Sequence, residues 1–247
     1  MTHDWKIIRE QTVGSTNDYL HQMVVLDTPD NLTVVVAQVQ TKGRGHHDAV
    51  WESEAGKNLT FSIFFKPAEL PAKHQFVLSQ ALSLGICSAI EKVCNVKPAI
   101  KWPNDIYIDN RKLCGILIEN SIMGNCIDTS IMGVGINVNQ EAFVSDAQNP
   151  ISLKQFMRIE YDLDKLLQTM LSEIKIRFDE LENGFYQAID EAYCEKLYRR
   201  GEWSFFDANG NRFKACITGV SEFGELMVID EKGMPLMFGH KEIQFVL

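Results

Sequence analysis

The pattern of hydrophobic and polar positions divides the first half of the chain into short strands and one long helix. Residues 33–39 (TVVVAQV) and 59–65 (LTFSIFF) are rich in β-branched and aromatic side chains and bounded by polar residues, which is typical of buried strands. A polar loop that contains glycine connects them. From residue 74 to 93, apolar residues recur at helical spacing, and Pro98 lies just beyond this segment. We expect this helix to cover one face of a sheet.

The middle of the chain continues the sheet and then becomes helical. Four apolar segments are predicted as short strands: AIKW, DIYID, KLCGILIE and TSIMGVGINVN. Asp109 and Asn110 are suited to a tight hairpin turn between two of them. Helical spacing returns at residues 162–181, and a further helix is expected at 185–198. The predicted fold class is therefore α+β, with a mixed, mostly antiparallel sheet backed by helices.

The final segment has a different pattern of hydrophobic and polar residues. Residues 203–246 form short alternating runs separated by three turn signals, Asn209-Gly210, Phe223-Gly224 and Lys232-Gly233. This pattern predicts a compact barrel of hairpins. We expect a large domain at residues 1–200 and a small one at 201–247.

Composition narrows the classes of function. The 247 residues carry 24 basic and 33 acidic side chains, for a net charge of −9, without a Lys/Arg block, which argues against a nucleic-acid partner. Any anionic ligand must then be held by cations placed locally. No stretch reaches about 18 uninterrupted apolar residues, and the first residues lack a basic segment followed by an apolar one. We therefore expect a cytoplasmic protein without a membrane partner.

The cysteines give no sign of a metal site or a disulfide framework. Six of them occur at irregular spacings inside apolar segments, without a CxxC pair: Cys87, Cys94, Cys114, Cys126, Cys194 and Cys216. We predict reduced thiols in the hydrophobic core.

The loop QTKGRGHHDAVWES, residues 40–53, contains candidate ligand-binding residues. Gly43 and Gly45 allow close backbone approach, and Arg44 between them offers planar donors suited to a carboxylate or phosphate. Gly-Arg-Gly alone also fits a surface turn. The neighbouring Gln40, which can donate and accept, and Trp51, which could shield a planar group, favour a binding loop.

Two further segments combine charges with strand ends. KWPND supplies a cation, an amide and a carboxylate in Lys101, Asn104 and Asp105, although Asn104 and Asp105 could equally cap a turn. Lys112 begins an apolar strand, where a charge requires a partner unless the side chain reaches the rim of the sheet. Gly115, three residues later, indicates close approach by a ligand or another backbone.

Two remaining motifs leave alternatives open. In GSTND, Ser15 or Thr16 could cap a helix, and their hydroxyls could equally reach a ligand. In GVGINVN, Gly133 and Gly135 lie inside a predicted strand ahead of Asn137. Like Gly115, they could allow close approach by a ligand or another backbone, although they could mark only a bulge.

These motifs together resemble a known family. GSTND, QTKGRG, KWPND, KLCGILIE and GVGINVN occur in the order and approximate spacing found in the biotin protein ligases. The resemblance covers essentially the whole chain, because the segment from about Gly201 is similar to the family's small SH3-like C-terminal barrel. It implies the monofunctional form, without the N-terminal winged-helix DNA-binding domain of some bacterial members.

The resemblance implies a two-step reaction. ATP, accompanied by Mg²⁺, activates biotin as biotinyl-5′-AMP, and the biotinyl group then passes to a lysine of a biotin carboxyl carrier protein or domain. Family members occur as monomers or homodimers, and we expect one of these states. A carboxylate that attacks a polyanion needs cations, which gives Lys112, Lys101 and Arg44 a common purpose.

Site roles follow from the resemblance, residue by residue. The biotin-binding residues are expected to be Ser15, Thr16, Asn17, Gln40, Gly43, Arg44, Gly45, His46, Lys112 and Gly115. The ATP-binding residues are expected to be Arg44, His46, Trp51, Lys101, Asn104 and Asn137. The catalytic residues are expected to be Lys112, Arg44, Asp105 and Lys101. Of these, Asp105 is the candidate for orienting or deprotonating the incoming amine.

The loop departs from the family pattern Gly-Arg-Gly-Arg-x-Gly. His46 stands where the second arginine usually lies, and Asp48 replaces the third glycine. We hypothesise that the intermediate is held less tightly in a mobile lid, or that protonated His46 replaces the arginine below about pH 6.5. Alternatively, His46 and His47 are only solvated, and Lys42 or Arg111 supplies the charge.

Two other functions compete with this interpretation. Lipoate protein ligases use the same fold and adenylate strategy, but the polar GSTN segment and Gln40 favour a ureido ring over a dithiolane tail. A biotin or adenylate sensor that binds without transfer is suggested by the altered loop. The presence of Lys112, Asp105 and Lys101 together argues against it.

Overall fold

The computed structural model describes residues 5–46, 49–144 and 149–246. The helices are α1 Thr16–Leu26, the 3-10 helix η1 Ala72–His74, α2 Phe76–Cys94, α3 Leu153–Met157, α4 Leu163–Glu182 and α5 Tyr186–Glu195. The strands of the larger sheet are β1 Lys6–Val13, β2 Thr33–Gln40, β3 Leu59–Phe65, β4 Ala99–Lys101, β5 Asp105–Ile108, β6 Arg111–Met123 and β7 Cys126–Ile136. The strands of the smaller sheet are β8 Trp203–Ala208, β9 Asn211–Val220, β10 Leu226–Asp230, β11 Pro235–Phe238 and β12 Gln244–Phe245.

The larger sheet is mixed and mostly antiparallel, as predicted. Its strand order is β1-β2-β3-β7-β6-β5-β4, and β1 with β2 forms its parallel pair. Asp109 and Asn110 make the expected two-residue hairpin between β5 and β6, with Asp109 in the left-handed region at φ 54°.

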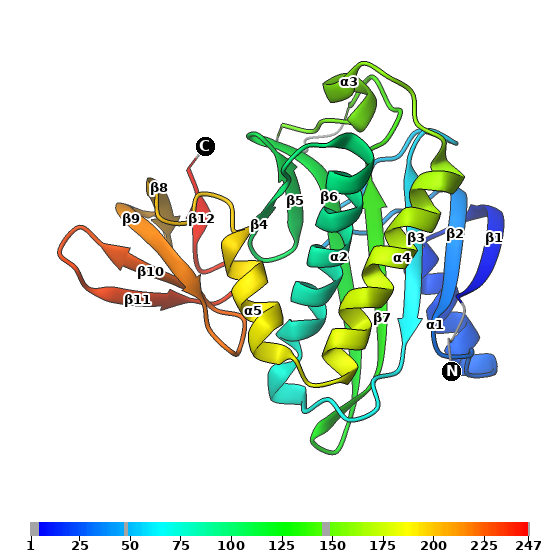
Figure 1. The fold of residues 1–247 in the computed structure, drawn as a ribbon, viewed down its shortest axis with the longest axis horizontal. Helices are drawn as coiled ribbons and strands as arrows, with labels where there is room; N and C mark the ends of the chain where they lie inside the picture. The colour runs from blue at the N-terminus through cyan, green and yellow to red at the C-terminus, as the bar shows by residue number, and fades with distance from the viewer. Residues whose placement is uncertain (1–4, 47–48, 145–148, 247) are drawn as a thin grey trace.

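The sheet is covered on both faces. In Figure 1, α2 and α4 lie across one face, while α1 lies behind the opposite face. Alternation along β2 explains this arrangement, because Val34 and Val36 point into the large core on the α2 side, whereas Val35 packs with Leu20 of α1. The ends of β2, β3, β6 and β7 that lie near the start of α1 are the part of the sheet that builds the site described below.

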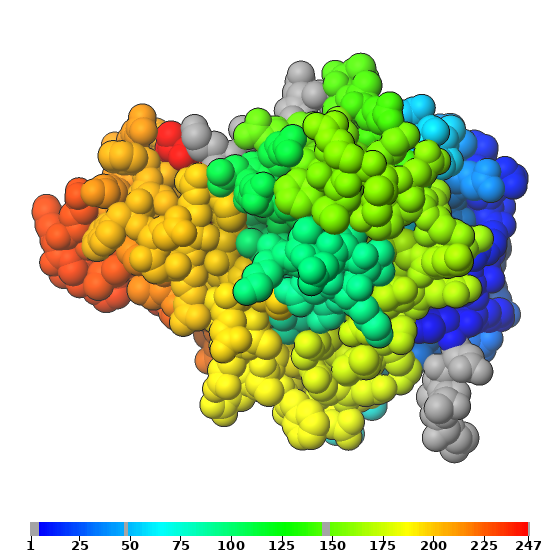
Figure 2. Space-filling model, turned by 45° about the horizontal axis from the view of Figure 1, so that its top comes forward, coloured from blue at the N-terminus to red at the C-terminus, as the bar shows by residue number. Residues whose placement is uncertain are grey.

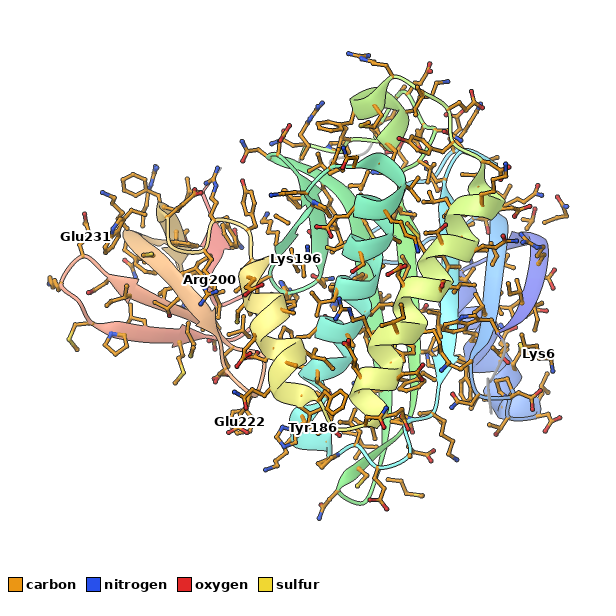
Figure 3. The ribbon with its side chains drawn as sticks, in the orientation of Figure 1. Lys6, Tyr186, Lys196, Arg200, Glu222 and Glu231 are labelled. Atoms are coloured by element: carbon orange, nitrogen blue, oxygen red, sulfur yellow. The ribbon has the colours of Figure 1, made fainter. Side chains whose placement is uncertain are left out.

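The smaller, antiparallel sheet forms the C-terminal lobe, which projects from the body of the molecule in Figure 2. The predicted turns close its hairpins, and Asn209 and Gly210 have φ angles of 53° and 81°. Lys196 and Arg200 lie where the chain crosses from α5 to this lobe (Figure 3). Leu197 bridges to Ile100 of β4 and Arg200 to Ile217 of β9, so this crossing fastens the two sheets together.

Several features differ from the sequence-based expectation. β1 and the short helix α3 were not predicted, and α5 ends at Glu195 rather than near residue 198. All six cysteines are free thiols, with no disulfide in the described ranges. The prediction that all are core residues is wrong for Cys126, which is exposed beside the β6–β7 turn, and for Cys216, which is half-buried on the outer face of β9.

Helix α2 is unusually apolar. Within the described residues, the segment 72–94 is the helix that is long and apolar enough to cross a membrane by length and composition alone. In this fold, 67% of its most apolar window is buried, packed between the larger sheet and α4. The same composition is what a core helix requires.

Candidate active site

A cavity of about 250 Å³ opens on the α1 side of the larger sheet. Its walls come from the start of α1, the β2–β3 loop (residues 41–58), β5, β6, β7 and the C-terminal lobe. The described residues that line it are Ser15, Thr16, Asn17, Gln40, Arg44, Gly45, His46, Ala49, Val50, Trp51, Asn104, Asp105, Lys112, Gly115, Ile116, Leu117, Gly133, Val134, Gly135 and His240. Most of the predicted site residues, although distant in sequence, therefore meet at one place.

One end of the cavity is a neutral hydrogen-bonding wall. Gln40 Oε1 accepts from the Thr16 backbone N at 2.8 Å and from Thr16 Oγ1 at 3.2 Å. The buried Ser62 hydroxyl lies 2.6 Å from both Thr16 Oγ1 and Asn17 Oδ1. Ser15 occupies the N-cap position of α1, but its side chain makes no capping bond with the described residues. This hydroxyl lines the cavity, so the ligand-binding alternative for GSTND is favoured over the capping one.

The glycines of β7 permit close packing on the sheet. A Cβ at Gly133 would lie 2.4 Å from Asn17 Oδ1, and a Cβ at Gly135 would lie 2.2 Å from Cε2 of Trp51. Both distances are far inside contact, so neither position accepts a side chain without movement of its neighbour. The Trp51 indole therefore lies directly on the backbone of β7, and its Nε1 finds no hydrogen-bond partner within the described ranges.

Lys112 and Asp105 supply the charges of the cavity. The Lys112 ammonium lies 2.7 Å from Asp105 Oδ1, and both side chains are largely buried. This partner explains how a lysine is tolerated in the apolar strand β6. The same ammonium lies 5.9 Å from the centre of the Trp51 ring, within cation–π range. Asn104 donates to the Ile116 carbonyl at 2.5 Å, which fastens the KWPND segment to β6.

The β2–β3 loop folds over the cavity as a small hairpin. Arg44 bridges to Val50, Gly45 N donates to the Ala49 carbonyl at 2.7 Å, and Trp51 N donates to Gly43 O at 3.0 Å. Gly43 is not among the described residues that line the cavity, and its expected contact with biotin stays a prediction. Its role here is to let the Trp51 backbone approach, since a Cβ at Gly43 would lie 2.4 Å from Trp51 O.

The loop meets the C-terminal lobe through two histidines. The rings of His46 and His240 lie 5.2 Å apart in an edge-to-face arrangement, and both line the cavity. His46 is therefore in contact with another ring and is not simply solvated. Lys42 and Arg111, the alternative sources of charge, are exposed and outside the described lining, while His47 and Asp48 lie outside the described residues.

Lys101 lies away from the described lining of the cavity, and its expected position along the phosphates stays a prediction. Its ammonium donates to Tyr107 Oη at 3.1 Å and lies 5.2 Å from the centre of the Phe245 ring of β12. Burial lowers the pKa of this amine, and Asp105 opposes that effect. Aromatic rings at the junction of the two sheets thus hold the lysine.

Asn137 also has a partner within the fold. Its side chain is buried and donates to the Ile151 carbonyl at 3.2 Å, outside the cavity lining of the described residues. Here it joins the end of β7 to the segment before α3. Its expected contact with a nucleotide stays a prediction.

Sequence reasoning also missed residues. His240 reaches the cavity only because the C-terminal lobe docks there, and no sequence pattern revealed this. Glu119, at the end of KLCGILIE, and Asp18, in GSTND, bind the Arg44 guanidinium. The available signal was a carboxylate inside an otherwise apolar strand, which requires a partner.

This arrangement is suited to an anionic ligand with a polar, uncharged end. One wall offers neutral donors and acceptors, the opposite wall offers a buried ammonium paired to a carboxylate, and a tryptophan covers the sheet between them. A mixed sheet with such a cavity beneath a loop agrees with the class of ligases that the motifs resemble.

Comparisons with known proteins agree. The model of the biotin/lipoate A/B protein ligase family matches residues 10–137, and the chain belongs to this family. It is 27% identical over 237 residues to the bifunctional ligase/repressor BirA of Bacillus spizizenii, covering 94% of this chain and 69% of that protein. It is 28% identical to the biotin–[acetyl-CoA-carboxylase] ligase of Mycobacterium tuberculosis, covering 69% and 63% respectively.

Solved structures share the fold. A biotin protein ligase from Aquifex aeolicus, in complex with biotin and ATP, superposes with a TM-score of 0.82 over 98% of this chain and 99% of its own, at 24% identity. The two-sheet architecture of this chain is therefore the fold of that ligase.

Proposed function

We propose that this chain is an ATP-dependent biotin ligase. It would activate biotin as biotinyl-5′-AMP and transfer the biotinyl group to a lysine of a biotin carboxyl carrier protein or domain. Family membership supports the ligase chemistry, and the names of the Bacillus and Mycobacterium relatives support biotin and a carboxylase acceptor. The observation that carries the proposal is the meeting of the Thr16–Gln40 wall and the Lys112–Asp105 pair in one cavity.

The neutral wall fits the ureido ring of biotin. A urea presents one carbonyl acceptor and two N–H donors, and the Ser15 hydroxyl can donate while the oxygens of the Thr16, Asn17 and Gln40 side chains accept. Because Ser15 is buried and makes no capping bond, a ligand that pairs with its hydroxyl is favoured over a purely apolar one. This argument favours biotin over lipoate, whose dithiolane ring offers no such donors.

In the first step, a biotin carboxylate oxygen bonds to the α-phosphorus of ATP. The bond between the α-phosphorus and the oxygen that bridges it to the β-phosphorus breaks, and pyrophosphate leaves. Two anions must approach each other, so a cation is required at that point. Lys112 is the ammonium in the described lining, and its bond to Asp105 fixes its position. The backbone from Arg44 to His46, which also lines the cavity, would meet the carboxylate and phosphate.

Mg²⁺ is proposed to enter with ATP. Among the described residues, no group of three His, Cys, Asp or Glu side chains is arranged to hold a metal ion. Asp105 is the carboxylate of the described lining, and Mg²⁺ commonly takes one or two protein carboxylates together with substrate phosphates and water. The residues present therefore fit a magnesium ion held chiefly by the phosphates, with Asn104 and Asp105 beside it.

In the second step, an acceptor lysine amine attacks the acyl carbon, and AMP leaves with the bonding electrons. The amine must first lose its proton, because an ammonium is not a nucleophile. Asp105 is placed to orient this amine and accept a hydrogen bond from it, since its carboxylate lines the cavity next to Lys112.

Biotin-dependent exchange of labelled pyrophosphate into ATP tests the first step. Exchange with biotin but not with lipoate supports the proposal, and Lys112→Ala should abolish most of it. Exchange with lipoate but not with biotin would indicate a lipoate protein ligase. Tight biotin binding without exchange would favour a sensor that binds biotin without transferring it. The observation that favours this alternative is the contact of His46, which stands where the family has an arginine, with His240.

A further inference from the structure

The Arg44 side chain is held by two carboxylates of the protein. Its Nη2 lies 2.6 Å from Glu119 Oε1 on β6, and its Nη1 donates to Asp18 Oδ1 on α1. These charge-assisted bonds raise the pKa of the guanidinium, the one to Glu119 most. The planar donor group that an anionic ligand would need is thus already engaged.

Glu119 connects this ion pair to the wall of the cavity. Its second oxygen, Oε2, accepts from Asn17 Nδ2 at 2.7 Å and lies 3.2 Å from His21 Nε2. Burial raises the pKa of Glu119, but the hydrogen bonds from Asn17 and Arg44 outweigh this effect and lower it overall. A single carboxylate therefore joins the loop, the first turn of α1 and β6.

Arg44 lies at a position from which it controls the shape of the loop. It belongs to the hairpin that is closed by the Gly45 and Trp51 amides. The same hairpin carries Trp51 onto Gly135. Fixing Arg44 to α1 and β6 therefore fixes the tryptophan over the cavity.

We propose that Glu119 and Asp18 are positioning residues that anchor the β2–β3 loop through Arg44, so that the Arg44 side chain serves the loop and not the ligand. The inference deepens the proposed function, on which its kinetic consequences rest. Two of the five N–H donors of Arg44 are committed to these carboxylates, and the two negative charges disfavour an anionic ligand at the same guanidinium.

The first test uses the ligand-free protein. Hydrogen exchange of the Gly45 and Trp51 amides is measured in wild type, Glu119→Gln and Asp18→Asn. Exchange should accelerate roughly tenfold in Glu119→Gln, because a hydrogen bond to a charged group is lost. Glu173→Gln is the matched control, since Glu173 forms an ion pair with Lys92 at 3.0 Å on the opposite side of the sheet. Unchanged protection in Glu119→Gln would overturn the proposal.

The second test follows release of biotinyl-5′-AMP. Anchoring predicts roughly tenfold faster release from Glu119→Gln, and Glu119→Asp, whose shorter side chain keeps the charge, should recover part of the loss. If Arg44 instead binds the ligand, removing Glu119 frees it, and release should be unchanged or slower, which overturns the proposal. If wild type forms no adenylate, the ligase function fails, while the exchange measurement still decides the anchoring role.

Discussion

The ammonium of Lys112 and the carboxylate of Asp105 form a 2.7 Å ion pair between the adjacent strands β6 and β5, and both groups line the cavity. Asp105 pairs with Gly115 across the two strands, and a Cβ at Gly115 would lie 3.4 Å from Lys112 Cε. The two residues can thus serve successive steps at one place.

Lys112 and Asp105 should affect different steps of the reaction. Lys112→Met removes the cation beside the attacking carboxylate, so pyrophosphate exchange should fall about 100-fold. Asp105→Asn should slow transfer from preformed biotinyl-5′-AMP to the carrier more than it slows exchange, because it removes the acceptor for the amine proton. Exchange and single-turnover transfer are measured for each variant. Equal losses in both steps for both variants would contradict this division.

The glycines of β7 give a steric prediction. Gly135→Ala would place a methyl group against the Trp51 indole, and Gly133→Ala would place one against Asn17. We expect at least about tenfold weaker biotin binding in calorimetry for each, because the neighbouring side chain must leave its position. Gly219→Ala is the control, since its Cβ would meet Met227 Cε at an ordinary 3.4 Å. Retention of full affinity in both β7 variants would show that the floor is not in contact with ligand.

Glu119 gives a pH dependence of stability. Its folded-state pKa is below the ordinary value of 4.5, so the stability it contributes is present above that value and is lost as pH falls through the lowered pKa. Glu119→Gln should therefore be less stable than wild type by about 1 kcal/mol at pH 7. The difference should vanish in acid, where the protonated carboxyl resembles an amide. Urea unfolding at several pH values measures it, and a difference independent of pH would count against the ionised pair.

His46 gives a fourth prediction. His46→Arg places a planar cation where the family pattern has one, and we expect biotinyl-5′-AMP to dissociate about tenfold more slowly. His74→Arg makes the same chemical change outside the described lining of the cavity and serves as the control. If dissociation from His46→Arg is not slower, the altered loop does not weaken retention of the intermediate.

Burial patterns explain which elements could be predicted from the sequence. The strands predicted at residues 59–65 and 33–39 match β3, all of whose residues are buried, and β2, whose first five residues are buried. β1 was missed because most of its residues are exposed, so its hydrophobicity has no period that a sequence reveals. The short helix α3 depends on a capping box between Ser152 and Gln155 rather than on an amphipathic pattern.

The site was predicted where motifs carry it and missed where only tertiary packing does. Backbone requirements at Gly115 and the charge of Lys112 left local signals. Glu119 left only the signal of a carboxylate inside an apolar strand, and His240 left none, because their partners come from a loop and a lobe that fold back from elsewhere in the chain. The surroundings of Lys101 could not be predicted, because the rings that contact it, Tyr107 and Phe245, come together only at the junction of the two sheets.

The most direct test of the central claim is the intact mass of a biotin carboxyl carrier domain after incubation with this protein, ATP, Mg²⁺ and biotin. We expect the acceptor lysine to gain one biotinyl group. This gain should be absent with Lys112→Ala, and no modification should occur when lipoate replaces biotin. A carrier that stays unmodified, although the protein binds biotin, would contradict the proposed ligase and indicate a protein that only binds.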